Sequence, residues 1–291
     1  MSCMDDKDLM KLIEFKKHFF DVLSNNYDAG ELNTIFYLFI DHFLNISKID
    51  FLKNTEYKID QENLSLLNKK LNELKSDRPI QYVIGKILVS DLILIVNENV
   101  LIPRPETIEL CEWIESFNFQ DVRILDIGTG SGLIAMLLKK KLSKSIVDAC
   151  DISLKSLEIA KKNASINNLK VDFFSLDILN ESLSRNRYDI IVSNPPYVSL
   201  SDKDKMHRRV VEFEPNNAIF VNNNDPLIFY NQIAQKAKES LNKKGFIFFE
   251  CNSDYISGVN DILLKNSFSN IEIRSDFRNN KRMIKARNGQ S

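Results

Sequence analysis

The chain has 291 residues, of which 44% are hydrophobic and 27% charged, a composition that excludes a disordered protein and suffices for one large domain and a smaller one. Its 39 basic and 40 acidic residues leave a formal net charge of −1, so no overall field attracts nucleic acid or an anionic membrane. No run of about eighteen apolar residues occurs, which disfavours a membrane protein. We expect a cytoplasmic location.

The cysteines and histidines point away from metal chemistry. The four cysteines lie far apart, no C-x-x-C pair occurs, and there are only three histidines. Zinc sites and the disulfide frameworks of small secreted domains need closer or denser ligands. We therefore predict no metal site and no disulfide framework involving Cys3, Cys111, Cys150 and Cys251.

The first segment, residues 1–77, carries three helical stripes of apolar residues. Apolar side chains recur at every third or fourth position in Leu9–Val22, Leu32–Phe43 and Leu64–Leu74, which is the spacing of amphipathic helices. Asp60 precedes the third stripe as a candidate N-cap. The pattern predicts a small all-α N-terminal domain with its aromatic side chains in the core.

The second segment, residues 78–104, is predicted to be a β-hairpin linker. Two short apolar runs, Ile87–Val89 and Leu92–Val96, flank Ser90–Asp91. Apolar runs separated by two turn-forming residues are typical of a hairpin. The hairpin would link the two domains.

The third segment, residues 105–291, alternates strand and helix patterns. Pro103 and Pro105 stiffen the chain before a helix that we expect to begin near Thr107. From Val122 onward, apolar strand-like runs alternate with helical ones, which predicts an α/β fold with a Rossmann-like, doubly wound and mostly parallel sheet. Later strands are expected at Gly245–Phe249, Ile271–Ile273 and Met283–Ala286, the last two as an antiparallel pair.

A glycine-rich loop follows the first strand of this sheet. The strand Val122–Ile127 leads into glycines at alternate positions, and a helix-like stretch, Leu133–Lys141, follows them. Such glycines let the backbone turn sharply and approach a ligand, with the free N–H groups of the next helix nearby. The spacing is neither G-x-G-x-x-G nor a P-loop, which disfavours a small dehydrogenase. A nucleotide-type cradle is predicted at Asp126, Gly128, Thr129, Gly130, Ser131 and Gly132.

Two further acidic residues follow strands at regular intervals. Asp151 ends the strand-like run Ser145–Cys150, where an acidic residue commonly binds ribose hydroxyls. Asp177 follows Val171–Phe174, and Ile178 beside it offers an apolar contact for an adenine ring. Because each acid lies one strand-and-helix unit after the last, a doubly wound sheet brings them to its carboxyl edge, where ligands bind. Either acid alone is also a suitable helix N-cap.

The run Asn194-Pro195-Pro196-Tyr197 directly follows the apolar strand 190–193. Two consecutive prolines end the strand and stiffen the loop, because each fixes φ and removes a backbone donor. The Asn194 side-chain oxygen and the Pro195 carbonyl can accept both hydrogens of a planar NH2 group while Tyr197 packs on its face. We predict these four residues as catalytic, although strand termination alone would also explain the prolines.

The order of these motifs resembles that of S-adenosylmethionine-dependent methyltransferases that modify planar amino groups. Within that class the chain is most similar to the HemK/PrmC family, the bacterial peptide-chain release factor glutamine methyltransferases. The similarity runs from about residue 78 to the C-terminus and includes Arg78–Gly85, Val100–Thr107 and Phe213–Pro215.

The resemblance implies transfer of a methyl group from S-adenosylmethionine to the side-chain amide nitrogen of the glutamine in the Gly-Gly-Gln motif of release factors, with S-adenosylhomocysteine as product. Gly128–Gly132 would hold the methionine part of the cofactor, Asp151 the ribose, and Asp177 with Ile178 the adenine side. Asn194–Tyr197 would grip the glutamine amide, and Asn194 would also face the cofactor.

The resemblance also implies an organisation and a partner. Residues 1–77 would form a substrate-recognition domain and residues 105–291 the methyltransferase domain. The expected partner is a release factor, bound by a monomer without direct contact to nucleic acid. Two departures bear on docking: Cys251–Ser253 stands where the family usually has glycine-containing sequence, and Arg278–Lys281 separates an acid from an arginine near the C-terminus.

Three other functions remain open. Asn-Pro-Pro-Tyr suits an adenine NH2 equally well, so an adenine amino-methyltransferase acting on DNA or RNA is one alternative. A ribosomal-protein glutamine methyltransferase is another. A non-catalytic scaffold that binds a translation partner is the third, and the intact motifs count against it.

Overall fold

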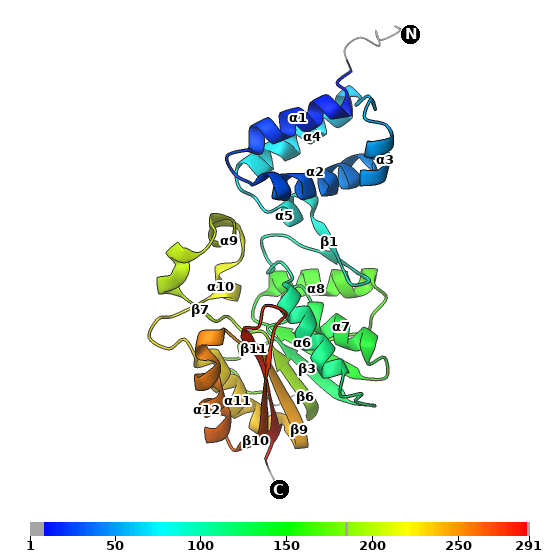
Figure 1. The fold of residues 1–291 in the computed structure, drawn as a ribbon. Coiled ribbons are helices and arrows are strands. Elements are labelled where there is room, and N and C mark those ends of the chain that lie inside the picture. The colour runs from blue at the N-terminus through cyan, green and yellow to red at the C-terminus, as the bar shows by residue number, and fades with distance from the viewer. Residues whose placement is uncertain (1–8, 184–185, 290–291) are drawn as a thin grey trace. The chain divides into compact units, whose positions relative to one another are not determined.

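The computed structural model describes residues 9–183 and 186–289, so Cys3 lies outside the described residues. The chain forms two compact units, Met1–Gly85 and Lys86–Ser291. The predicted linker, 78–104, is thus divided after Gly85. Figure 1 shows the elements of each unit along the chain.

The N-terminal unit is helical. Its helices are α1 (Leu12–Leu23), α2 (Ala29–Leu44), α3 (Lys48–Lys53), α4 (Gln61–Lys75) and α5 (Ile80–Ile84). Asp60 caps α4 as expected, because its carboxylate accepts a hydrogen bond from Asn63 N at 2.8 Å. The apolar stripes pack together around four fully buried phenylalanines, Phe15, Phe19, Phe36 and Phe39. Helix α5 occupies part of the predicted linker and ends at Gly85, whose φ of 79° is the left-handed conformation common after helices.

The second unit begins with the predicted hairpin. Strands β1 (Lys86–Val89) and β2 (Leu92–Ile95) pair antiparallel around Ser90 and Asp91. The outer edge of β2 is bonded by side chains of helix α8 (Leu154–Ile166) and its C-cap rather than by another strand. Asn163 exchanges two hydrogen bonds with the Ile95 backbone, and Asn167 does the same with Ile93. The hairpin is therefore anchored to the larger unit.

The core of the second unit is a seven-stranded sheet with the order β10-β11-β9-β6-β3-β4-β5. Its strands are β3 (Arg123–Ile127), β4 (Ile146–Asp151), β5 (Asp172–Ser175), β6 (Tyr188–Ser193), β9 (Leu241–Glu250), β10 (Phe268–Ser275) and β11 (Lys281–Asn288). Strands β3 to β6 and β9 run parallel, while β10 and β11 add the expected antiparallel pair. The Rossmann-like, mostly parallel fold predicted from the sequence is confirmed.

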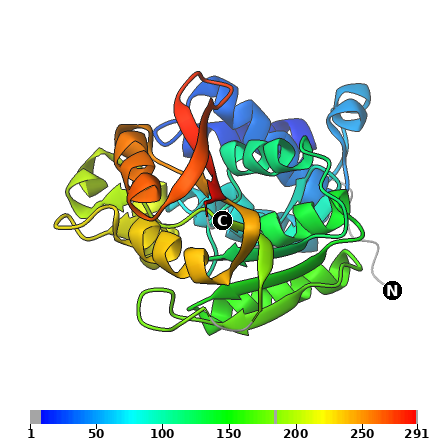
Figure 2. The same ribbon diagram turned by 90° about the horizontal axis from the view of Figure 1, so that it is seen from below.

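Helices cover both faces of this sheet (Figure 1, Figure 2). The long helices are α6 (Pro105–Glu115), α7 (Leu133–Lys141), α8, α11 (Ile228–Ser240) and α12 (Ile256–Lys265). Successive residues of β9 show the two layers: Phe248 packs against Trp113 of α6, and Phe249 packs against Tyr230 of α11. This alternation follows from the two-residue period of a strand.

Several boundaries differ from the sequence-based expectations. Helix α6 begins at Pro105 rather than near Thr107, because proline at the first helical position lacks only an N–H that would be unpaired there anyway. Strands β9 and β10 are longer than their apolar runs, since ladder pairing extends into polar residues.

Within residues 9–183 and 186–289, no helix is both long and apolar enough to cross a membrane.

Two short parallel strands complete the second unit. They are β7 (Val198–Ser199) and β8 (Phe220–Val221), and between them lie the helices α9 (Arg208–Phe213) and α10 (Asn216–Ile219). Glu214, which caps α9 and is 4% exposed, accepts hydrogen bonds from Ile102 N at 3.1 Å and from Arg104 at 2.6 Å. These two hydrogen bonds to Glu214 join the segment before α6 to the segment after Tyr197.

Candidate active site

The register of the parallel strands brings four loop-forming positions to one level. Ile127 pairs with Cys150 on one side and with Ser193 on the other, and Ser193 pairs with Phe249. The next residues in the chain are Gly128, Asp151, Asn194 and Glu250. The carboxyl edge of the sheet therefore aligns the glycine loop, an acid, the Asn-Pro-Pro-Tyr turn and a second acid.

The glycine loop is held by the strand beside it. The N–H groups of Gly128 and Thr129 both donate to Cys150 O, at 2.9 and 3.0 Å, and Gly130 N donates to the Asp151 carboxylate at 2.9 Å. Gly128 and Gly130 have φ values of 75° and 53°, in the region that favours glycine. A Cβ at either position would meet no atom within 4 Å. Open space therefore lies over the loop, where a ligand could approach the backbone.

Asp126 supports the glycine loop from beneath. Its side chain is completely buried and accepts hydrogen bonds from the Thr129 hydroxyl at 2.6 Å and from Ala135 N at 3.2 Å. Burial raises the pKa of this carboxyl to about 7, although both hydrogen bonds oppose the shift. These contacts give Asp126 a structural role in the loop, and its predicted contact with a cofactor stays a prediction.

A cavity of about 260 Å³ opens beside the loop. Among the predicted site residues, six line it: Gly128, Asp151, Asp177, Ile178, Pro195 and Pro196. The sequence analysis did not single out eight further lining residues, which are Ile127, Ile152, Leu176, Leu179, Ser193, Asn217, Phe229 and Ile233. Most of these are apolar, so the cavity combines an apolar wall with carboxylates at its edge, as small-molecule sites generally do.

The two carboxylates of the cavity differ in environment. The Asp151 carboxylate accepts from Gly130 N and Ser153 N, both at 2.9 Å, and burial raises its pKa. At Asp177, by contrast, a hydrogen bond from the Asn180 side chain lowers the pKa of the carboxyl. A carboxylate has about four acceptor positions, so Asp151 retains capacity for ligand hydroxyl groups.

The remaining predicted residues lie beside the cavity. Thr129 and Ser131 are buried within the glycine loop, at 6% and 5% exposure. A Cβ at Gly132 would lie 3.2 Å from Ala160 Cβ, so this glycine allows close packing against α8. Asn194 and Tyr197 point toward a polar cluster instead of lining the cavity wall.

That polar cluster contains two residues that the sequence analysis did not predict. Asn194 Nδ2 donates to Thr107 Oγ1 at 3.1 Å, and Thr107 Oγ1 donates to Glu250 Oε2 at 2.7 Å. The Tyr197 hydroxyl lies 3.4 Å from Glu250 Oε1. Burial raises the pKa of Glu250 to about 7, against the opposing effects of the Thr107 hydrogen bond and of Arg282. Glu250 could have been found from the sequence because it ends a strand of the parallel sheet. It directly follows Phe249, the residue that pairs with Ser193.

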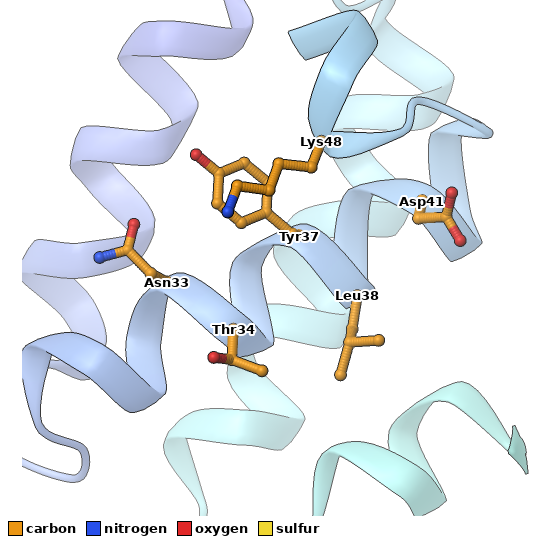
Figure 3. A pocket seen from close by; sticks show the side chains of 6 residues that line it. All are labelled: Asn33, Thr34, Tyr37, Leu38, Asp41 and Lys48. Carbon is orange, nitrogen blue, oxygen red and sulfur yellow. The ribbon is translucent and has the colours of Figure 1, made fainter. Parts of the chain in front are cut away.

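The N-terminal unit has a surface hollow of its own, which Figure 3 shows. Its lining consists of Asn33, Thr34, Tyr37, Leu38, Asp41 and Lys48. The Lys48 ammonium lies 5.1 Å from the centre of the Tyr37 ring, which is within cation–π range. The hollow is wide open to solvent, and nothing in it matches the predicted chemistry.

Comparison with known proteins decides the family. The Methyltransferase small domain family matches residues 110–280, more than half of the chain. The release factor glutamine methyltransferase of Flavobacterium psychrophilum is 38% identical over 281 residues, which cover 95% of this chain and 99% of that protein. This chain belongs to the release factor glutamine methyltransferase family.

A second relative agrees with this family, and a solved structure agrees with the fold. The release factor glutamine methyltransferase of Bacteroides thetaiotaomicron is 34% identical over 265 residues, covering 91% of this chain and 95% of that protein. A crystal structure of a methyltransferase from Pyrococcus furiosus superposes with a TM-score of 0.51 at 15% identity, covering 79% of this chain and all of the other. The likeness in structure concerns the fold. The resemblance to the HemK/PrmC family stated from the motifs is thus confirmed.

Proposed function

We propose that this chain transfers the methyl group of S-adenosylmethionine to the side-chain amide nitrogen of the glutamine in the Gly-Gly-Gln motif of peptide-chain release factors. The observation that carries the proposal is the register: the stiff Asn-Pro-Pro-Tyr turn, a feature suited to a planar NH2 group, lies level with the glycine loop and Asp151. The names of the relatives, which cover nearly the whole chain, supply the substrate.

The residues present fit S-adenosylmethionine. The open space over Gly128 and Gly130 leaves room for the methionine part close to the backbone. The half-buried Asp151 offers acceptor atoms for ribose hydroxyls, and Ile178 with Phe229 supplies apolar surface for the adenine ring. When bound, the cofactor supplies an electrophilic methyl group, and S-adenosylhomocysteine is the product.

The chemical task of the protein is to align a poor nucleophile. A carboxamide nitrogen is weakly nucleophilic because its lone pair is delocalised into the carbonyl. If Asn194 Oδ1 and the Pro195 carbonyl accept its two hydrogens, the lone pair points away from both and toward the methyl donor. Alignment of this kind supplies several kcal/mol of the barrier, up to roughly 7–11 in ideal cases.

The same two acceptors stabilise the positive charge that develops on the nitrogen. Preorganised dipoles contribute about 3–4 kcal/mol per well-placed group. The proton leaves after methyl transfer, so the scheme needs no general base before attack. The fixed φ angles of Pro195 and Pro196 keep the carbonyl acceptor from drifting.

The direct test is transfer of labelled methyl from S-adenosylmethionine to purified bacterial release factor. A release factor with Gln→Ala in its Gly-Gly-Gln motif, DNA, RNA and ribosomal protein are the parallel substrates. Label on the wild-type release factor alone supports the proposal. Label on nucleic acid would indicate an adenine amino-methyltransferase. Label on ribosomal protein would indicate a ribosomal-protein glutamine methyltransferase. Label on none of the substrates would indicate the non-catalytic scaffold.

The proposal also covers how the release factor is bound, the oligomeric state of the enzyme and its location. The helices of residues 1–77 are proposed to contact the release factor, because a glutamine within a folded protein offers binding surface beyond its amide. The enzyme is proposed to act as a cytoplasmic monomer of 33.7 kDa, without direct contact to nucleic acid. Gel filtration with and without release factor tests the stoichiometry.

A further inference from the structure

We propose that Thr107 and Glu250 are positioning residues that hold the Asn194 amide with its oxygen, not its NH2 group, toward the substrate. The inference rests on the proposed role of Asn194 and deepens it. Neither residue is assigned a function by the motifs from which the family was inferred. They reach Asn194 from elements remote in sequence, helix α6 and the end of strand β9.

The three side chains form a continuous buried chain of hydrogen bonds. Thr107 is 5% exposed and Glu250 1% exposed, while Asn194 is half-buried at the end of β6. The Asn194 Nδ2 to Thr107 Oγ1 distance is 3.1 Å, and the Thr107 Oγ1 to Glu250 Oε2 distance is 2.7 Å. The backbone carbonyl of Glu250 also accepts from the Tyr230 hydroxyl at 3.0 Å, which anchors the acid at the strand end. The cluster is therefore set by three different elements.

The direction of these hydrogen bonds follows from proton counting. A carboxylate only accepts, and a threonine hydroxyl carries a single hydrogen. When Glu250 is ionised, Thr107 must donate to it and can only accept from Asn194. The NH2 group of Asn194 then faces Thr107, so its Oδ1 points the other way from Cγ, within the same amide plane. An acceptor directed at the substrate NH2 is what the proposed reaction needs.

Protonation of Glu250 would remove this constraint. A neutral carboxyl group can donate to Thr107, which frees the threonine hydrogen for Asn194 Oδ1 and allows the amide to turn over. Its NH2 group would then meet the NH2 of the substrate, donor against donor. Because burial raises the pKa of Glu250 to about 7, this change would fall near neutral pH.

The surroundings of Glu250 contain charges of both signs. The burial-driven rise in its pKa is opposed by the Thr107 hydrogen bond and by Arg282 of β11, while Glu106 of α6 adds to it. Arg282 itself lies 3.6 Å from Asp276. The titratable groups that face the acid from neighbouring elements are Glu106, Cys111, Tyr197, Tyr230, Cys251 and Arg282.

The first test removes the hydroxyl. Thr107→Val keeps the shape of the side chain but cannot bond Asn194, and we expect kcat for release factor methylation to fall about 10- to 100-fold. Affinity for S-adenosylmethionine, measured by calorimetry, should change less than about twofold. Thr107→Ser, which retains the hydroxyl, should recover most of the loss. Ser116→Ala, which removes the hydroxyl of the α6 C-cap residue bonded to Trp113 O, is the control and should leave kcat unchanged.

A double-mutant cycle separates this inference from the proposed function. If Thr107 acts through Asn194, Thr107→Val should cause no further loss in an Asn194→Ala enzyme. If the Asn194→Ala single variant is impaired but the Thr107→Val single variant is fully active, the inference about Thr107 is overturned while the proposed function stands. An Asn194→Ala enzyme as active as the wild type would instead overturn the proposed role of the Asn-Pro-Pro-Tyr turn.

The second test is the pH dependence of kcat at saturating substrates, and its first measurement uses the wild-type protein. The wild-type kcat should rise tenfold per pH unit below an apparent pKa near 7 and level off above it. In Glu250→Gln, which keeps the size of the side chain but cannot ionise, this limb should disappear. A wild-type kcat that is constant from pH 5.5 to 8.5, or the same limb in Glu250→Gln, would contradict the inference.

Discussion

The phenylalanines of α1 and α2 pack ring against ring in the N-terminal unit, whereas the carboxyl edge of the sheet buries carboxylates. Phe19 is fully buried, and its ring centre lies 5.4 Å from that of Phe36 and 5.3 Å from that of Phe39. Asp126 and Glu250 are buried just as deeply, at 0% and 1% exposure, but they bond to hydroxyl groups. The helical core and the carboxyl edge of the sheet therefore bury side chains of opposite character.

The difference distinguishes burial for stability from burial for function. Burying an aromatic side chain stabilises a fold by about 1.5–3 kcal/mol, while burying a carboxylate destabilises it unless the charge is compensated. Elsewhere in the sheet unit, buried Asp148 is paired with Arg123 at 2.9 Å and buried Lys285 with Glu272 at 2.6 Å. The acids of the carboxyl edge are held by hydroxyl and backbone groups instead, and raised pKa values of this kind are typical of functional sites.

The largest expected effect concerns the apolar core. Phe19→Ala should destabilise the N-terminal unit by about 3–5 kcal/mol, because it removes a fully buried ring and leaves a cavity among Phe36 and Phe39. Hydrogen exchange resolved by segment should show the loss in residues 9–85 and not in the sheet. Leu38→Ala, on the exposed surface of α2, is the control and should change stability by less than about 0.5 kcal/mol. Equal losses in both variants would contradict the comparison.

Removing the proposed acceptor comes next. Asn194→Ala should lower turnover about 100- to 1,000-fold, as expected for loss of one oriented polar group in the transition state. Because Asn194 does not line the cavity wall, affinity for S-adenosylmethionine should stay near normal. Single-turnover methylation of release factor and calorimetric titration of the cofactor measure the two quantities. Unchanged turnover would remove Asn194 from the mechanism.

Asp151→Ala should change mainly the affinity for the cofactor, not turnover. Loss of a half-buried charged acceptor that lines the cavity and bonds Gly130 N should weaken S-adenosylmethionine binding by about 1.5–3 kcal/mol. Asp177→Ala is the comparison variant, and we expect a smaller loss because the Asp177 carboxylate bonds Leu179 N and the Asn180 side chain rather than the glycine loop. Normal cofactor affinity in Asp151→Ala would exclude Asp151 from the ribose site.

The last prediction concerns stability as a function of pH, where the expected change per pH unit is small. The pKa of Asp126 is raised to about 7 in the folded protein from an ordinary value of 3.8. The folded state therefore binds the proton more tightly, so this contribution to stability is fully present below pH 4 and is lost as the pH rises toward 7. Asp126→Asn should make the slope of unfolding free energy against pH shallower over this range, by at most about 1.4 kcal/mol per pH unit. Urea titrations at several pH values measure that slope, and an identical slope in Asp126→Asn would show that Asp126 does not titrate as described.

Local patterns in the sequence were enough to predict most of this architecture. The helical stripes, the hairpin around Ser90 and Asp91, and the helix Leu133–Lys141 all depend on spacing and turn chemistry within a few residues. The glycine loop and the Asn-Pro-Pro-Tyr turn each end a recognisable strand. A parallel sheet then places such ends at one edge without knowledge of any particular contact.

Only the tertiary structure decided which side chains meet at that edge. Thr107 and Glu250 are 143 positions apart in sequence, and Thr107 and Asn194 are 87 apart, so no local period links them. Their contact depends on the strand order that puts β9 beside β6, and on the register that pairs Phe249 with Ser193. The sequence alone determined the elements and the residue types of the site, because these depend on short-range geometry. The hydrogen-bond directions and the buried charges came from long-range packing, which sets strand order, register and solvent exclusion together.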